Sequence, residues 1–240
     1  MTEKELRQKV VSTALAWLGM REYSAKHQEM LDIYNSQSPL PRGTRMLASW
    51  PWCAAFVSTV SLQCSLRDIM PTECGCPGMV RLYQELGRWV EDDAYVPSPA
   101  DVVFYDWQDT GYGDNVGQPD HVGIVTACDG QTMTIVEGNC DNAVKTRSLA
   151  VNARFIRGYG VPDFASKADG AEPQPEPAPA PTPQPEPEKP AEESTVDPFI
   201  TKTAREVIAG KWGNGQARRD ALAAWFTKAV QDEVNRILGG

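Results

Sequence analysis

Positive charge and histidine are both scarce in this sequence. Its 240 residues include 23 Lys and Arg against 32 Asp and Glu, which gives a formal net charge of −9. Because phosphate binding needs clustered Lys and Arg, we expect no nucleic-acid partner. The chain has only two histidines, His27 and His121, so any chemistry that uses an imidazole must use one of these two.

Long apolar runs are absent as well. No stretch of about 18 or more apolar residues occurs, whereas a membrane-spanning helix needs such a length. The N-terminal residues are mixed in charge and lack the basic region and apolar run of a secretory signal. We therefore expect no membrane partner, and synthesis in the cytoplasm without a signal peptide.

Cysteine is present in moderate number, at Cys53, Cys64, Cys74, Cys76, Cys128 and Cys140. In a long chain without a visible signal, these residues indicate free thiols and not a disulfide framework. Cys74 and Cys76 could form a metal or redox pair, but zinc normally takes four clustered Cys or His ligands and neither histidine is near them in sequence. We expect no metal site and no cofactor, and the role of this pair stays open.

Composition divides the chain into three segments. Residues 1–168 carry most of the aromatic and β-branched residues and are expected to form the larger domain. Pro recurs at nearly every second position in much of residues 169–195, which favours an extended linker. Residues 196–240 contain two helical patterns and predict a small all-α bundle.

The first segment changes from helical to strand patterns along its length. Helices are expected at residues 3–18, 53–64 and 77–86, and strands at residues 102–105, 121–127, 132–137, 145–149 and 155–161. The Asp129-Gly130 pair predicts a hairpin between the second and third strands. Helices followed by a meander of antiparallel strands predict an α+β domain.

Cys53 follows a loop rich in Pro, Ser and Gly and opens the apolar helical stretch at residues 53–64. A helix N-terminus stabilises a thiolate, and its free N–H groups can also stabilise an oxyanion. Cys53 is therefore a candidate nucleophile. The alternative is a buried core cysteine, because free Cys is among the most buried residue types.

His121 begins the alternating strand pattern HVGIV and is the candidate base for Cys53. His27 lies in a polar stretch and is expected to face solvent. The predicted hairpin would bring Glu137 and Asn139 beside His121, where a side-chain oxygen could orient the imidazole. For Glu137, the alternative is an ordinary charge at the end of a strand.

These residues resemble the CHAP domain, the cysteine, histidine-dependent amidohydrolase/peptidase of the NlpC-like, papain-related superfamily. The resemblance rests on WCAAFV at residues 52–57, HVGIV at 121–125 and EGN at 137–139, and covers roughly residues 1–165. It implies a papain-like fold with helices packed on an antiparallel sheet. Some relatives bind calcium through an acidic loop before the nucleophile, but residues 39–49 contain no acid, so we expect no such site here.

The resemblance also implies roles for single residues. Cys53 would be the nucleophile, His121 the general base and then acid, and Glu137 the orienting group. Asn139 would be a further polar participant, and Trp52, beside the nucleophile, would contact substrate. CHAP domains act on peptidoglycan, at the muramoyl–L-alanine amide or at peptide bonds of the stem and cross-bridge.

The C-terminal segment is similar to the CW-seven cell-wall-binding repeat of phage lysins. The match rests on AREVIAGKWGNG at residues 204–215 and AVQDEVN at 229–235. By the chemistry of their side chains, Trp212 could stack on a sugar, while Lys211 and Arg218 could pair with peptide carboxylates. The alternative for Trp212 is a core position in a very small domain. With only one repeat, avidity from linked sites is missing.

Both halves indicate bacterial peptidoglycan as the partner, bound through its stem peptide and its muramyl-peptide part. We therefore predict a phage or prophage endolysin-like hydrolase that acts on the cell wall after release and forms a thioester on Cys53. Two alternatives stay open, an acyl-transferring cysteine enzyme and a wall-binding protein without catalysis. The bond cut, the target species and the oligomeric state are not predicted.

Overall fold

The computed structural model describes residues 1–109 and 115–169. The C-terminal bundle, most of the linker and the predicted wall-binding residues Lys211, Trp212 and Arg218 lie outside the described residues. The helices of the described residues are α1 (Glu3–Leu15), α2 (Ala25–Asn35), α3 (Cys53–Cys64) and α4 (Cys76–Glu85), with short 3₁₀ helices η1 (Pro41–Gly43) and η2 (Phe164–Lys167). The strands are β1 (Trp89–Val90), β2 (Val102–Tyr105), β3 (His121–Cys128), β4 (Thr132–Cys140), β5 (Ala143–Ala150) and β6 (Ile156–Gly160).

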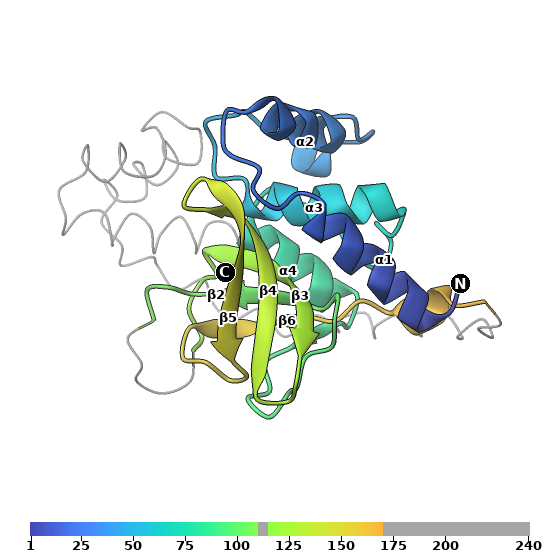
Figure 1. Ribbon diagram of the computed structural model, residues 1–240, viewed down its shortest axis with the longest axis vertical. Coiled ribbons are helices and arrows are strands. Elements are labelled where there is room, and N and C mark those ends of the chain that lie inside the picture. The colour runs from blue at the N-terminus through green and yellow to red at the C-terminus, as the bar shows by residue number, and fades with distance from the viewer. Residues whose placement is uncertain (110–114, 170–240) are drawn as a thin grey trace, which may run out of the picture. The chain divides into compact units, whose positions relative to one another are not determined.

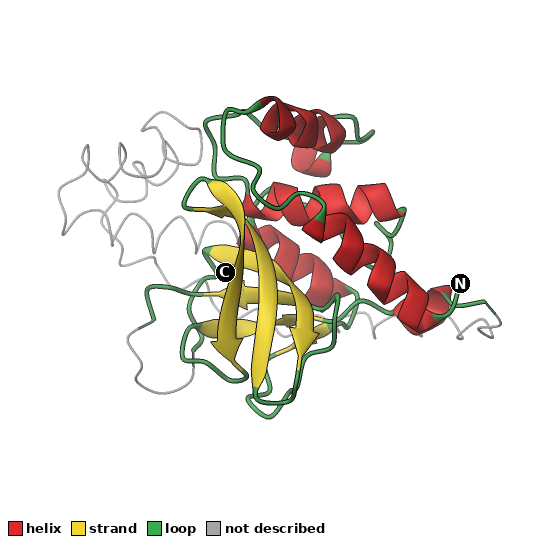
Figure 2. Cartoon of the chain, in the orientation of Figure 1, coloured by secondary structure: helices red, strands yellow, loops and turns green. Residues whose placement is uncertain are grey.

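The strands form one antiparallel sheet in the order β1-β6-β2-β3-β4-β5. Strands β2 to β5 follow one another as the predicted meander, and Asp129 and Gly130 form the predicted turn between β3 and β4, where Gly130 has φ 92°. The helices gather to one side of the sheet (Figures 1 and 2), and α3 packs against β3 and β4. The α+β class of this domain is thereby confirmed.

The sheet has apolar clusters on both faces. In β2, Val102 and Phe104 belong to the main core with the helices, whereas Val103 and Tyr105 belong to a second cluster. Successive side chains of a strand point to opposite faces, so all four β2 residues are buried. This double burial explains why β2 reads as a continuous apolar run.

Helix α1 begins and ends with recognisable local signals. Thr2 accepts a hydrogen bond from the Glu5 N–H while the Glu5 side chain accepts one from the Thr2 N–H, a capping box. The helix ends at Leu15, three residues before the predicted end, because residues 16–19 tighten into turns. Gly19 has φ 79° and donates its N–H to the carbonyl of Val144.

The position of His27 corrects the sequence prediction. His27 lies in α2 and is 1% exposed, so it does not face solvent. The ring lies 4.9 Å from that of Trp52, and its Nδ1 accepts a hydrogen bond from the Tyr23 N–H. The reason is helical periodicity, because His27 shares one face with three apolar residues, Met30, Leu31 and Tyr34.

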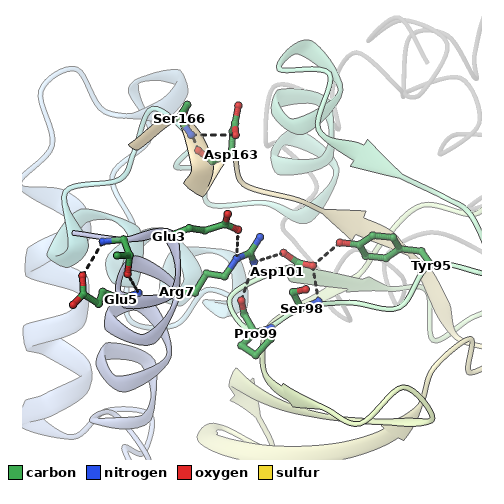
Figure 3. Close-up of polar contacts among 10 residues, drawn as sticks. Glu3, Glu5, Arg7, Tyr95, Ser98, Pro99, Asp101, Asp163 and Ser166 are labelled. Carbon is green, nitrogen blue, oxygen red and sulfur yellow. Dashed lines mark hydrogen bonds and ion pairs between the residues drawn. The ribbon is translucent and has the colours of Figure 1, made fainter. Parts of the chain in front are cut away.

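A buried carboxylate joins α1 to the sheet (Figure 3). Asp101 is 0% exposed and accepts hydrogen bonds from the Arg7 guanidinium at 3.0 Å, the Tyr95 hydroxyl at 2.5 Å and the Ser98 N–H at 2.8 Å. A buried charge is stable only when it is paired and hydrogen-bonded. These contacts fix the start of β2, the strand that pairs with β3.

Candidate active site

Cys53 is the first residue of α3, as predicted, and only 5% of its surface is exposed. The preceding residue, Trp52, provides no side-chain cap for the helix. The first N–H groups of a helix have no acceptor within the helix itself. The Cys53 sulfur therefore lies at the positive end of the α3 dipole, beside backbone donors that no capping side chain occupies.

His121 is the first residue of β3 and pairs in register with Tyr105 of β2. The imidazole stacks on the Tyr105 ring at a centroid distance of 5.7 Å and is 12% exposed. Its Nε2 lies 3.3 Å from Oε2 of Glu137, on the neighbouring strand β4. The hairpin thus brings His121 and Glu137 together, and Nδ1 is the ring nitrogen left for the sulfur of Cys53.

Glu137 is completely buried and has two charged partners. Its Oε2 faces His121, and its Oε1 accepts a hydrogen bond from Nε of Arg147 at 2.7 Å. Burial alone would raise the pKa of Glu137, but the hydrogen bonds and charges of His121 and Arg147 lower it to about 2. Glu137 is therefore an anion at neutral pH and can hold His121 in one orientation.

The electrostatics of the site favour a thiolate beside an imidazolium. The pKa of the Cys53 thiol is lowered well below its usual value, first by a hydrogen bond from Cys76 and then, against burial, by the hydrogen bond and charge of His121 and by the Ala54 N–H. Burial would lower the pKa of His121, but Cys53 and Glu137 raise it to about 9. The Cys53 thiol thus gives up its proton more readily than an ordinary cysteine, and His121 holds its proton more strongly than an ordinary histidine.

This geometry coincides with a match to a known family. Residues 45–139 match the family model of the CHAP domain, and this range includes Cys53, His121 and Glu137. This part of the chain is therefore similar to the CHAP domain. Residues 202–238 match the model of the CW_7 repeat, so the chain also carries one such repeat in its C-terminal part.

Two individual proteins are also similar to parts of the chain. A lysozyme of Streptococcus phage Cp-7 is 56% identical over 40 residues, which are 16% of this chain and 12% of that protein. The chain therefore matches only a small part of that relative's length. The protein described in "The crystal structure of Ly7917" aligns with 65% of this chain and 62% of its own at 14% identity, with a TM-score of 0.37.

Trp52 requires a correction within the CHAP domain. The resemblance implies that Trp52 contacts substrate, but its side chain is completely buried and packs against the ring of His27. The cause is its place immediately before α3, where the chain enters the core. Trp52 packs in the core beside the start of α3, and its buried ring cannot contact a substrate in this conformation.

Asn139 lies at the irregular end of β4, where the register with β5 shifts. Its backbone is left-handed with φ 60°, and its Oδ1 is buried without a hydrogen-bond partner in the described part of the chain. The preceding residue, Gly138, lies so close to Phe56 of α3 that a Cβ there would come within 2.4 Å of that side chain. The β4 end is thus held against the helix that carries Cys53.

Arg147 is a site residue that the sequence does not predict. In the β4–β5 hairpin, Glu137 lies directly opposite Lys145, and Arg147 is the diagonal neighbour two residues further on. Lys145 instead binds Asp141 at 2.8 Å, whereas Arg147 reaches Glu137 and lies over the Trp107 ring at 4.8 Å. Cross-strand spacing alone could have suggested both residues without choosing between them.

The described residues show neither a metal cluster nor a membrane helix. In residues 1–109 and 115–169, no three His, Cys, Asp or Glu side chains gather in a way that could hold a metal ion. No helix there has the length and apolar character needed to cross a membrane.

We expect the Arg147→Met variant to hydrolyse substrate roughly tenfold more slowly. A charge-assisted hydrogen bond contributes ~1.5 kcal/mol, and an activation free energy raised by that amount slows a reaction about tenfold. Without the guanidinium, Glu137 loses one of its two charged partners and orients His121 less well. The measurement is kcat on a soluble peptidoglycan fragment. Lys145→Met is the matched control on the same strand and should leave kcat unchanged; equal losses in both variants would contradict the role of Arg147.

The activity of the CHAP domain should depend on pH through the Cys53–His121 pair. We expect kcat/KM to fall as pH rises through about 9, because His121 then loses the proton that the leaving group needs. The profile is measured on a soluble fragment, with a melting temperature at each pH to identify unfolding. An alkaline limb near the ordinary imidazole pKa of about 6.5 would show that the pair does not form.

Proposed function

We propose that this protein is a cysteine hydrolase that cleaves an amide bond of bacterial peptidoglycan and that its CW_7 repeat holds it on the cell wall. The observation that carries the proposal is the alignment of Cys53 at the start of α3, His121 on β3 and Glu137 on β4. A buried thiolate, an imidazolium and an orienting carboxylate are the parts that acyl transfer to a cysteine requires.

The reaction begins with attack of the Cys53 thiolate on the carbonyl carbon of the amide. The N–H groups in the first turn of α3, including that of Ala54, donate hydrogen bonds to the oxygen that becomes negative. His121 gives its proton to the leaving amine, and a thioester on Cys53 remains. His121, now neutral, takes a proton from water; the hydroxide attacks the thioester and the Cys53 thiolate leaves.

Peptidoglycan is supported as substrate by two separate parts of the chain. The CHAP domain resembles enzymes that act on peptidoglycan, and the CW_7 repeat lies in the C-terminal part. The similar protein from phage Cp-7 is a lysozyme, which favours a phage or prophage endolysin released onto the wall. The bond is then the muramoyl–L-alanine amide or a peptide bond of the stem.

We further propose three parts for the chain, a catalytic domain at residues 1–168, a linker at 169–195 and a wall-binding domain at 196–240. In the last of these, Trp212 would stack on a sugar, and Lys211 and Arg218 would pair with peptide carboxylates. One repeat has no second site for avidity, so wall binding would be weak and reversible.

The test is mass-spectrometric mapping of the products from purified peptidoglycan, with turbidity loss recorded in parallel. New amino termini within the peptides would identify an endopeptidase, and freed lactyl groups an amidase at the muramoyl bond. Both must be absent with Cys53→Ala. New reducing sugar ends without any new amine would show glycosidase chemistry and overturn the proposal.

A further inference from the structure

A second cysteine touches the candidate nucleophile. Sγ of Cys76 lies 3.7 Å from Sγ of Cys53, and both residues are 5% exposed. Each is the first residue of a helix, Cys53 of α3 and Cys76 of α4. Two helix starts thus meet through their sulfurs, although the two residues are 23 positions apart in sequence.

This pairing distinguishes Cys76 from the other cysteines. Their sulfurs contact different partners: Cys64 with Thr13, Cys74 with Arg42, Cys128 with Gly130 and Cys140 with Arg147. Cys74 is only two residues from Cys76, yet its side chain belongs to the Arg42 and Glu73 cluster. Within the described residues, the contact with Cys53 is therefore particular to Cys76.

We propose that Cys53 and Cys76 form an oxidation site, in which a peroxide oxidises Cys53 and Cys76 then closes a reversible disulfide with it. The inference rests on the proposed function only in taking Cys53 as a thiolate nucleophile. A thiolate, and not a thiol, attacks peroxide, and a nearby second thiol can resolve the product. Closing the bond needs the sulfurs to approach from 3.7 Å to the disulfide length of about 2.05 Å.

The chemistry balances with hydrogen peroxide as the oxidant. The Cys53 thiolate attacks one peroxide oxygen, the O–O bond breaks, and the departing hydroxide takes the proton of His121 to give water and a sulfenic acid. The Cys76 sulfur then attacks the Cys53 sulfur. The S–S bond forms, the S–O bond breaks, and the hydroxide released takes the Cys76 proton as water.

The surroundings of Cys76 change during the first step in a way that assists the second. The pKa of Cys76 is held well above its usual value by its hydrogen bond to the Cys53 thiolate, by burial and by the thiolate's charge. A sulfenic acid carries no such charge, so oxidation of Cys53 removes one reason for Cys76 to keep its proton. His121, neutral at that moment, is a base beside the pair.

The consequence is a nucleophile that peroxide inactivates reversibly. In the disulfide, Cys53 cannot attack an amide, so hydrolysis stops. A thiol reductant breaks the S–S bond and restores the thiolate. Without Cys76, the sulfenic acid would stay open to further oxidation to sulfinic acid, which reductant does not reverse.

The experiment treats the full-length reduced protein with hydrogen peroxide and blocks the remaining thiols with N-ethylmaleimide. Digestion and mass spectrometry should then identify a peptide pair joined through Cys53 and Cys76, lighter by two hydrogen atoms. Hydrolysis should be lost on oxidation and return with dithiothreitol. With peroxide in excess, Cys53 of Cys76→Ser should be oxidised beyond the sulfenic acid to sulfinic acid, so its loss, compared with its own untreated activity, should persist after dithiothreitol, whereas the control Cys74→Ser should recover as the wild type does.

Two outcomes would overturn the inference. One is the absence of the Cys53–Cys76 peptide pair in oxidised wild-type protein, which needs no variant. The other is full recovery of Cys76→Ser with dithiothreitol after the same excess of peroxide, with no sulfinic acid on its Cys53 peptide. Failure of the proposed function has a different signature, because Cys53→Ala would then retain hydrolysis whether or not the linked peptides were found.

Discussion

Replacing Cys53 by alanine is expected to slow peptidoglycan hydrolysis about 10⁴-fold or more, the scale of loss when an attacking residue is removed from a catalytic unit. His121 and Glu137 would still lie 3.3 Å apart, but no sulfur would be available to form the thioester. The measurement is the initial rate of product release from purified peptidoglycan, with binding to the same wall followed by sedimentation. Hydrolysis should disappear while wall binding persists.

Two further variants identify the sulfur itself as the cause. Cys53→Ser keeps the shape of the side chain but should also be inactive, because a serine hydroxyl has too high a pKa for His121 to keep it ionised. Cys64→Ala is the matched control, since Cys64 is the buried last residue of the same helix and touches Thr13. If Cys53→Ala and Cys64→Ala lost the same modest amount of rate, Cys53 would be a core cysteine and not a nucleophile.

The parts of the site that the sequence predicted are those fixed by local pattern. A loop followed by an apolar helical stretch placed Cys53 at a helix start, and the structure begins α3 there. The Asp129-Gly130 turn and the alternation of β3 and β4 brought His121 next to Glu137. Such features depend on neighbours in sequence or across one hairpin, where turn type and register are determined by few residues.

The parts that were missed depend on packing between distant segments. Cys76 meets Cys53 only because α3 and α4 pack with their starts together, and no spacing in the sequence encodes that. The polar neighbours of His27 predict an exposed side chain, whereas the buried face of α2 includes it. The register of β4 and β5 predicts Lys145 as a partner of Glu137 just as well as Arg147. The contact of Arg147 with the Trp107 ring distinguishes the two residues.

The two halves of the site also differ in how they are held. Cys53 is fixed by backbone, as the first residue of a helix packed on β3 and β4. The imidazole of His121 is fixed by side chains, with the Tyr105 ring on one face and Glu137 at Nε2. Loss of a positioning side chain such as Arg147 should therefore disturb the base and leave Cys53 in place, whereas Cys53→Ala removes the attacking sulfur itself.

Removing the imidazole with His121→Ala should lower kcat/KM about 10³-fold, within the range that a general acid–base contributes. The shape of the pH profile should change as well. In wild-type protein, the charged imidazole of His121 favours the thiolate of Cys53. In the variant, Cys53 loses that charge, so the residual rate should increase with pH as the thiol ionises, where wild-type activity declines through about pH 9.

This reversal separates a chemical role of His121 from a structural one. Loss of packing would lower the rate by a similar factor at every pH, whereas loss of the partner charge changes the sign of the slope above neutral pH. His27→Gln is the matched control, because His27 is the other histidine, and its buried ring contacts those of Trp52 and Tyr23. It should lower the melting temperature but keep the wild-type profile. If His121→Ala kept the wild-type profile, another group would be the base, and the Cys53–His121 pairing would be wrong.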